Sequence, residues 1–126
     1  MTARRDRVYT VEEANAMLPG LRERLARVRE ARQVLLQSAE LVKERVTADG
    51  GGAHGGREYW EAQTTLKAEV EWLAEENVVL RDPETGLVDF PGEREGRRVW
   101  LCWRLGEERV ANWHELDSGF IGRHPL

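Results

Sequence analysis

The chain has 126 residues, a formal net charge of −4 at pH 7 and one third of its residues charged. This balance excludes both the basic excess of a nucleic-acid-binding domain and the composition of a disordered chain. No apolar run approaches the roughly 20 residues needed to span a bilayer, and the first residues lack the apolar segment of a signal peptide. The single cysteine excludes an internal disulfide. We therefore expect one domain over residues 1–126, located in the cytoplasm.

A helix start is encoded near the N-terminus. Thr10 and Glu13 form a capping box, in which each side chain accepts a hydrogen bond from the other residue's backbone N–H, so a helix should begin at Val11. Proline lacks an N–H and clashes with the preceding helical turn. We therefore expect this short helix to break near Leu18, with Pro19 opening a second helix.

The second helix is predicted from a sustained apolar stripe. The apolar residues follow steps of three and four, apart from an interruption at Arg32, and are Leu18, Leu21, Leu25, Val28, Leu35, Ala39, Val42 and Val46. This pattern predicts a helix to about Arg45, on the order of 40 Å long at 1.5 Å per residue.

A glycine-rich segment separates this helix from another. Asp49–Gly56 is typical of a flexible linker and lacks the Gly-Lys-Ser/Thr of a phosphate-binding loop. Arg57–Asn77 then carries its own apolar stripe: Tyr59, Ala62, Leu66, Val70 and Leu73. Two long helices joined by such a linker predict an antiparallel hairpin over 11–77.

The charges agree with antiparallel pairing. Five arginines lie in the first half of the long helix, and four glutamates lie in the last half of the following one: Arg22, Arg24, Arg27, Arg29, Arg32, and Glu69, Glu71, Glu75, Glu76. Pairing within the chain explains the arginine run more simply than a nucleic-acid partner does. We therefore expect no nucleic-acid binding.

From residue 78 the apolar spacing changes to period two. Residues 78–80 and 87–90 flank Asp82–Gly86, whose Pro83 and Gly86 are typical of a hairpin turn, and Pro91 should end the second strand. Two further strands are expected at 98–105 and 110–115. The predicted fold class is α+β: a helical hairpin, preceded by a short capped helix, packed on an antiparallel sheet of three or four strands within 78–126.

The strand at 98–105 is apolar on both sides, which is typical of a strand covered on both faces. The hairpin should cover one face, and the C-terminal tail or a second subunit the other. A turn centred on Glu107-Glu108 would place His114 opposite Leu101 on an apolar face, although a slip of one residue would reverse every face. His114 is then either a general base or metal ligand, or a buried histidine satisfied by a carboxylate such as Asp89 or Asp117.

The C-terminal residues include several with ligand chemistry. His114, Asp117 and His124 are weak metal candidates, because no recognised spacing places three ligands on one element. Cys102 is interpreted as a small core residue. Arg104 and Arg123 suit a small anionic ligand, with local pairing to acids such as Glu107 as the alternative. The candidate ligand-binding residues are Asp89, Arg104, Glu107, His114, Asp117 and Arg123.

Three segments of the chain resemble one protein family. They are TVEEANAMLPGLRERL, DPETGLVDFP and VWLCWRLGEERVANWHELDSGFIGRHPL, and the run Trp-His-Glu-Leu-Asp-x-Gly-Phe with the closing Gly-Arg-x-Pro-Leu is the most specific part. They resemble a family of small prokaryotic proteins known as domain of unknown function 2203. The resemblance implies a fold shared along nearly the whole chain and transfers no activity, cofactor or catalytic residue.

Two functional hypotheses follow from these patterns. The first is a non-enzymatic association protein acting as a homodimer, because the long helices carry more apolar stripe than a short sheet can cover. The second is a small-ligand or metal-ion binding protein, or an enzyme, that uses the C-terminal cluster. The residue patterns indicate no particular cofactor.

Overall fold

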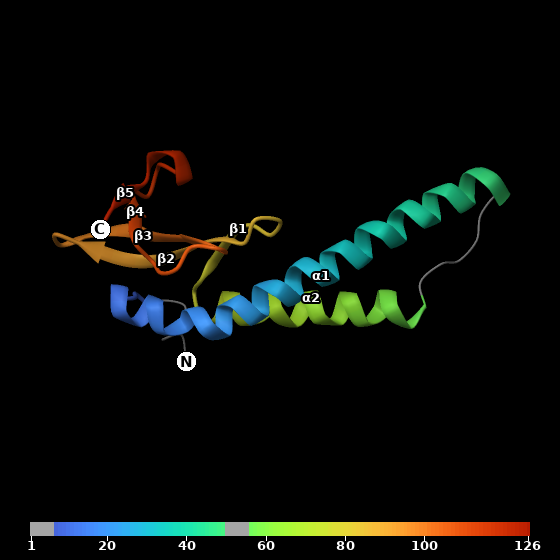
Figure 1. Ribbon diagram of the computed structural model, residues 1–126, viewed down its shortest axis with the longest axis horizontal. Coiled ribbons are helices and arrows are strands. Elements are labelled where there is room, and N and C mark those ends of the chain that lie inside the picture. The colour runs from blue at the N-terminus through green and yellow to red at the C-terminus, as the bar shows by residue number, and fades with distance from the viewer. Residues whose placement is uncertain (1–6, 50–55) are drawn as a thin grey trace.

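The computed structural model describes residues 7–49 and 56–126. Two helices, α1 (Val11–Asp49) and α2 (Arg57–Glu75), run antiparallel beside each other, and a sheet packs against the first half of α1 (Figure 1). The chain is therefore α+β, as predicted. Most of the predicted glycine linker lies outside the described residues. Within the described ranges, neither helix has an apolar stretch long enough to cross a membrane.

Helix α1 is continuous, so the predicted break at Pro19 is wrong. The capping box is present: Thr10 N–H donates to Glu13 at 2.9 Å, and Glu13 N–H donates to Thr10 Oγ1 at 3.0 Å. The helix continues past Pro19 because Leu18 and Leu21, on either side of it, are both buried in the same core. Tertiary packing of these side chains offsets the one hydrogen bond that proline removes.

Helix α2 ends two residues before the predicted boundary. Asn77 adopts a left-handed conformation at φ 61°, and Val78 N–H reaches back to Leu73 O at 2.9 Å. This is a Schellman-type termination, in which an asparagine replaces the more usual glycine. It turns the chain directly from α2 into the first strand.

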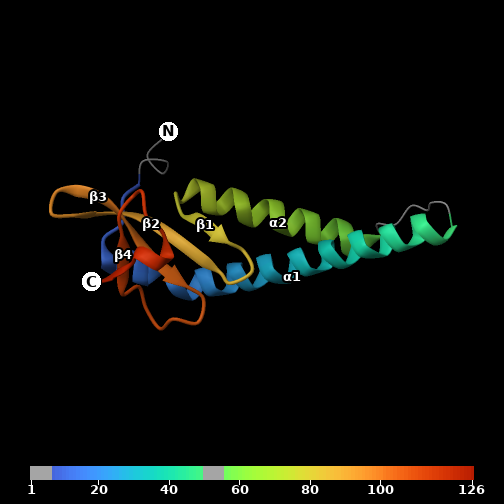
Figure 2. The same cartoon turned by 90° about the horizontal axis from the view of Figure 1, so that it is seen from above.

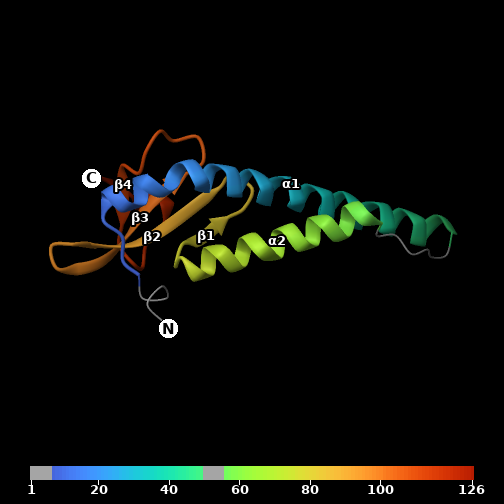
Figure 3. The same cartoon turned by 90° about the horizontal axis from the view of Figure 1, so that it is seen from below.

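The sheet has five strands in the order β1-β2-β3-β4-β5, all antiparallel. The strands are β1 (Val79–Asp82), β2 (Leu87–Arg94), β3 (Arg97–Arg104), β4 (Asn112–His114) and β5 (His124–Pro125). The predicted three or four strands were too few because the last residues of the tail form the short β5. Figures 2 and 3 show that this sheet lies over one end of the hairpin, while the other end extends beyond it.

Strand β2 continues through Pro91, so the prediction that Pro91 ends it is wrong. The pairing of β2 with β1 stops at Asp89, and the Pro91 carbonyl accepts a hydrogen bond from Tyr9 N–H at 2.7 Å on that same edge. Because N–H and C=O of one strand residue point to the same side, the missing N–H of Pro91 faces an edge where β1 does not reach. The proline therefore costs no ladder hydrogen bond.

One face of the sheet closes the hydrophobic core. Val88 and Phe90 of β2 and Val99, Leu101 and Trp103 of β3 are buried on this face. They pack with the buried residues of α1, Ala14, Leu18, Leu21 and Leu25, together with Leu73 of α2. The core therefore joins the first half of α1 to the sheet, as expected for one cover of β3.

The hairpin is held by a buried ion pair that the charge pattern predicted. Glu69 of α2 is 6% exposed and accepts from Arg24 at 2.7 Å and from Arg27 at 2.8 Å. Burial opposes ionisation of Glu69, but the hydrogen bonds from Arg27 and Arg24 outweigh it and hold the pKa of Glu69 below its usual range.

We predict that Glu69→Gln destabilises the fold at neutral pH by about 1–2 kcal/mol, since it removes charge-assisted hydrogen bonds whose arginine partners are partly exposed. A carboxylate with a lowered folded pKa contributes stability above its unfolded pKa of about 4.3 and loses it as the pH falls through the folded value. Urea unfolding of both proteins from pH 7 to pH 3 should therefore show the difference shrinking below about pH 5. A difference that is constant over this range would contradict the assignment.

Candidate functional site

The second face of the sheet carries polar groups at its centre. Asp89 of β2 pairs with Cys102 of β3, and Trp100 of β3 pairs with His114 of β4. Because paired residues share a face and neighbours alternate, Asp89, Cys102 and His114 all point away from the helices. The predicted register was one residue out, and His114 therefore lies on the face opposite Leu101 rather than beside it. The slip arises because the chain between β3 and β4 is longer than a tight hairpin turn.

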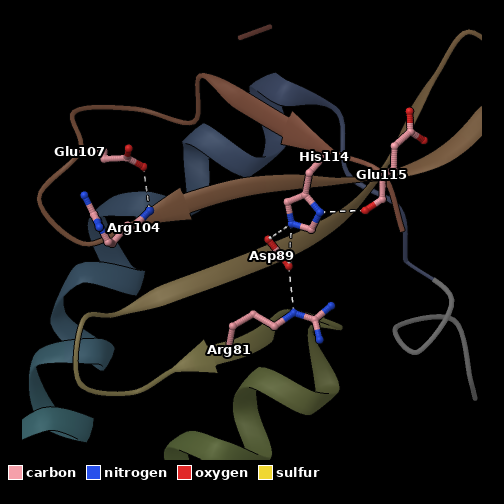
Figure 4. A network of polar contacts seen from close by, with 6 residues as sticks. All are labelled: Arg81, Asp89, Arg104, Glu107, His114 and Glu115. Carbon is pink, nitrogen blue, oxygen red and sulfur yellow. Dashed lines mark hydrogen bonds and ion pairs between the residues drawn. The ribbon is translucent and has the colours of Figure 1, made fainter. Parts of the chain in front are cut away.

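Asp89 and His114 form a buried pair. Their exposed fractions are 2% each, and His114 Nε2 lies 3.0 and 3.1 Å from the two carboxylate oxygens of Asp89. Arg81 of β1 donates from Nε to Asp89 Oδ2 at 2.9 Å (Figure 4). Of the two carboxylates that sequence analysis offered as a partner for His114, the structure selects Asp89.

The other ring nitrogen of His114 defines its tautomer. Nδ1 lies 2.8 Å from the backbone oxygen of Glu115, which can only accept a hydrogen bond, so Nδ1 carries a proton. A neutral imidazole has a single N–H, and here it is used on Glu115. Nε2 therefore presents its lone pair to the Asp89 carboxylate, an arrangement that suits a cation held between the two groups.

Cys102 is fully buried beside this pair. Burial, the negative charge of Asp89 and a hydrogen bond to Asp89 together raise the pKa of the Cys102 thiol to about 12. A thiol with this pKa is not a nucleophile at neutral pH. Sequence analysis did not place Cys102 in the site, because only the correct register brings it next to Asp89 and His114.

The C-terminal tail covers this face and leaves a pocket of about 300 Å³. Asp89, Cys102 and His114 form its floor, Arg81 and Leu87 one side, and the tail residues Leu116–Phe120 the other. The tail is thus the second cover that β3 was expected to need. Asp117 lines the pocket but is exposed, and the ring nitrogens of His114 contact Glu115 O and Asp89 instead.

The remaining candidates form a separate group around Phe120. Arg104 and Arg123 stack on the Phe120 ring at 4.7 and 4.4 Å, and Arg123 Nη2 pairs with Glu107 Oε2 at 2.7 Å. Glu107 also caps the turn by accepting from Arg104 N–H at 2.9 Å (Figure 4). Arg123 and Glu107 thus make the local pair that was the alternative to an anion site, and both arginines fix the tail through Phe120.

His124 does not approach His114. It lies on β5 opposite Trp113, whose ring it contacts at a centroid distance of 4.8 Å. Trp113 points toward the hydrophobic core, so His124 and His114 lie on opposite faces of the sheet. Sequence analysis also missed Arg81, and no pattern around this residue distinguishes it from other surface arginines.

These features define a small α+β protein with a buried carboxylate–imidazole–thiol cluster under its C-terminal tail. The chain belongs to the family described as "Uncharacterized conserved protein (DUF2203)", whose model matches residues 7–126. The resemblance noted in the sequence is thereby confirmed. The comparisons with curated proteins and with solved structures found no match.

We predict that His114→Ala destabilises the protein by about 3 kcal/mol, because it leaves the buried Asp89 carboxylate without one partner. Asp89→Asn should cost about 1 kcal/mol or less, because the new amide can donate to Nε2 and still accept from Arg81. Urea unfolding followed by tryptophan fluorescence measures both. Equal losses in the two variants would contradict the assigned tautomer.

Proposed function

We propose that this protein acts by association, as a non-enzymatic homodimer in the cytoplasm. The observation that carries the proposal is a set of large apolar side chains exposed on the hairpin. Trp60 is 61% exposed, Leu36 53%, Val70 49% and Leu41 45%. A monomer in water gains nothing from exposing such side chains together, and exposed apolar surface of this kind is typical of interfaces.

The far half of the hairpin has little internal core of its own. Beyond Ala31 of α1, no described side chain of that helix is buried, and Ala62 is the only buried residue in the first three turns of α2. A hollow of about 550 Å³, lined by Val34, Leu41 and Tyr59 among others, lies between the helices there. Helices without a well-packed partner depend on further burial for their stability, which a second copy would supply.

The outer surface of α2 offers a self-complementary stripe. Trp60 and Val70 line a shallow apolar groove together with Gln63, Thr64, Leu66 and Lys67. A two-fold axis through the outer surface of α2, midway between Trp60 and Val70, would pack two copies of α2 antiparallel. Each Trp60 then contacts the second copy's Val70, and each Lys67 faces a Gln63. A symmetric contact of this kind forms a closed dimer, and the same surface is then no longer available to bind further copies.

We predict that Val70→Glu converts the dimer to a monomer and weakens association by about 100-fold or more, because it places two charges in a desolvated interface. Size-exclusion chromatography with light scattering over a range of concentrations measures this. Ala68→Glu is the matched control: it adds the same charge to the same helix, about 160° around the axis from Val70, among exposed glutamates. A wild-type chain that remains a 14.5 kDa monomer at high concentration would end the proposal.

A second candidate function is the binding of a small ligand or a metal ion in the pocket under the tail. The observation that favours it is the placement of buried polar groups, Asp89 and His114, on the floor of an otherwise partly apolar pocket. Pockets with a few oriented polar groups and apolar walls are the usual form of small-molecule sites. The acids Asp89 and Asp117 in the lining favour a cationic or neutral ligand over the small anion considered from the sequence.

We predict that native mass spectrometry of untagged protein detects a small molecule bound to the wild type and not to Leu116→Trp, whose indole narrows the pocket. Ile121→Trp is the control, because it introduces the same side chain into the same tail at a residue that is 99% exposed and outside the lining. Equal occupancy in both variants would place the molecule elsewhere.

A further inference from the structure

The strongest unassigned feature is the set of donor atoms at the centre of the sheet. We propose that Asp89, Cys102 and His114 together bind one divalent zinc-type metal ion. Their nitrogen, oxygen and sulfur donors all lie within 4.8 Å of one another, and they are the only such group among the residues that the structure describes. The inference deepens the second candidate function, since it rests on the same pocket and names its occupant.

The three ligand residues lie on three neighbouring strands. Asp89 on β2 is directly opposite Cys102 on β3, and His114 on β4 is diagonal to Cys102 on the same face. All three residues are at least 98% buried, so their positions are determined by strand pairing and not by mobile surface loops. A site that is built on rigid elements meets the main geometric demand of metal binding.

The orientation of His114 is that of a metal ligand. Metal-bound histidines generally donate their other ring N–H to a carbonyl or carboxylate, which directs the free lone pair at the ion. Here Nδ1 donates to Glu115 O at 2.8 Å, and the Nε2 lone pair points at Asp89. A metal ion between these two groups would accept the Nε2 lone pair and a carboxylate oxygen of Asp89 at the same time.

The distance between His114 Nε2 and Asp89 Oδ1 needs little change to admit an ion. Zinc lies about 2.0–2.2 Å from nitrogen and oxygen ligands and about 2.3 Å from sulfur, so ligands at tetrahedral angles are about 3.3–3.6 Å apart. His114 Nε2 is already 3.0 Å from Asp89 Oδ1. Asp89 Oδ2 remains bound to Arg81, which would hold the carboxylate in position.

The charges of the ligands and the number of protein ligands indicate which type of metal site this would be. A thiolate and a carboxylate bring two negative charges to balance a divalent ion, and the combination of sulfur, imidazole and carboxylate selects zinc-type ions over magnesium or calcium. On binding, the Cys102 thiol would release its proton to solvent, so that a thiolate coordinates the ion. Three protein ligands leave a fourth position, which faces the pocket lined by Asp117 and Ser118. This is the coordination pattern of reactive rather than structural zinc sites.

The test uses untagged full-length protein that has been stripped with a chelator and titrated with Zn²⁺ by calorimetry and with Co²⁺ by absorption spectroscopy. We expect one equivalent of each ion to bind, with a thiolate-to-cobalt charge-transfer band. Cys102→Ala should abolish the band and weaken Zn²⁺ binding by about 100-fold or more, and Asp89→Asn should weaken it similarly while remaining folded by circular dichroism. His124→Gln, which removes a histidine from the other face of the sheet, should bind like the wild type.

The outcome also separates this inference from the broader pocket proposal. Absence of Zn²⁺ binding, or binding that is unchanged in Cys102→Ala and Asp89→Asn, would overturn the metal site even if an organic molecule is found in the pocket. Stoichiometric binding that depends on Cys102 and Asp89 and not on His124 would establish it even if no organic molecule co-purifies.

Discussion

The fold is organised by one constraint: strand β3 is apolar on both sides and must be covered on both. Val99, Leu101 and Trp103 on one face pack against α1, which accounts for the core. Trp100 and Cys102 on the other face point away from α1 and α2. The tail therefore returns across the sheet and pairs as β5 with β4, although its own sequence has few strand features. The pocket exists because a short irregular tail covers a flat sheet face less completely than a helix does.

The same constraint explains why the polar cluster is buried. The tail face needs groups that link β2, β3 and β4, and a carboxylate there must be paired or it would cost several kcal/mol. Asp89 meets this need by bonding across β3 to His114 and along the edge to Arg81. A hydrophobic pair of the same volume would serve stability equally well or better. The retention of ionisable groups in a core this small is thus better explained by binding chemistry than by stability alone.

Sequence patterns predicted the elements that depend on local chemistry. Side chains that are close in sequence were enough to predict the capping box at Thr10, the hairpin turn at Pro83–Gly86 and the end of α2 to within two residues. Charge was enough to predict the pairing of the arginine run with Glu69. Two predictions that were wrong, a helix break at Pro19 and a strand end at Pro91, depended on tertiary contacts that the sequence pattern does not show. Pro19 is tolerated because the core holds the helix on both sides of it, and Pro91 because β1 is too short to need its N–H.

The site was only partly predictable, for a related reason. Asp89 and His114 could be selected by residue type, but the residues that meet at the site depend on strand register, which the irregular segment between β3 and β4 determines. A shift of one residue would pair His114 with Leu101 instead of Trp100 and place it on the opposite face from Cys102. Glu107 is the residue that sets this segment: its side chain accepts from Arg104 N–H, and its backbone oxygen accepts from Trp103 Nε1 at 3.1 Å. The chemistry of the cluster thus depends on a turn acid that has no contact with the pocket.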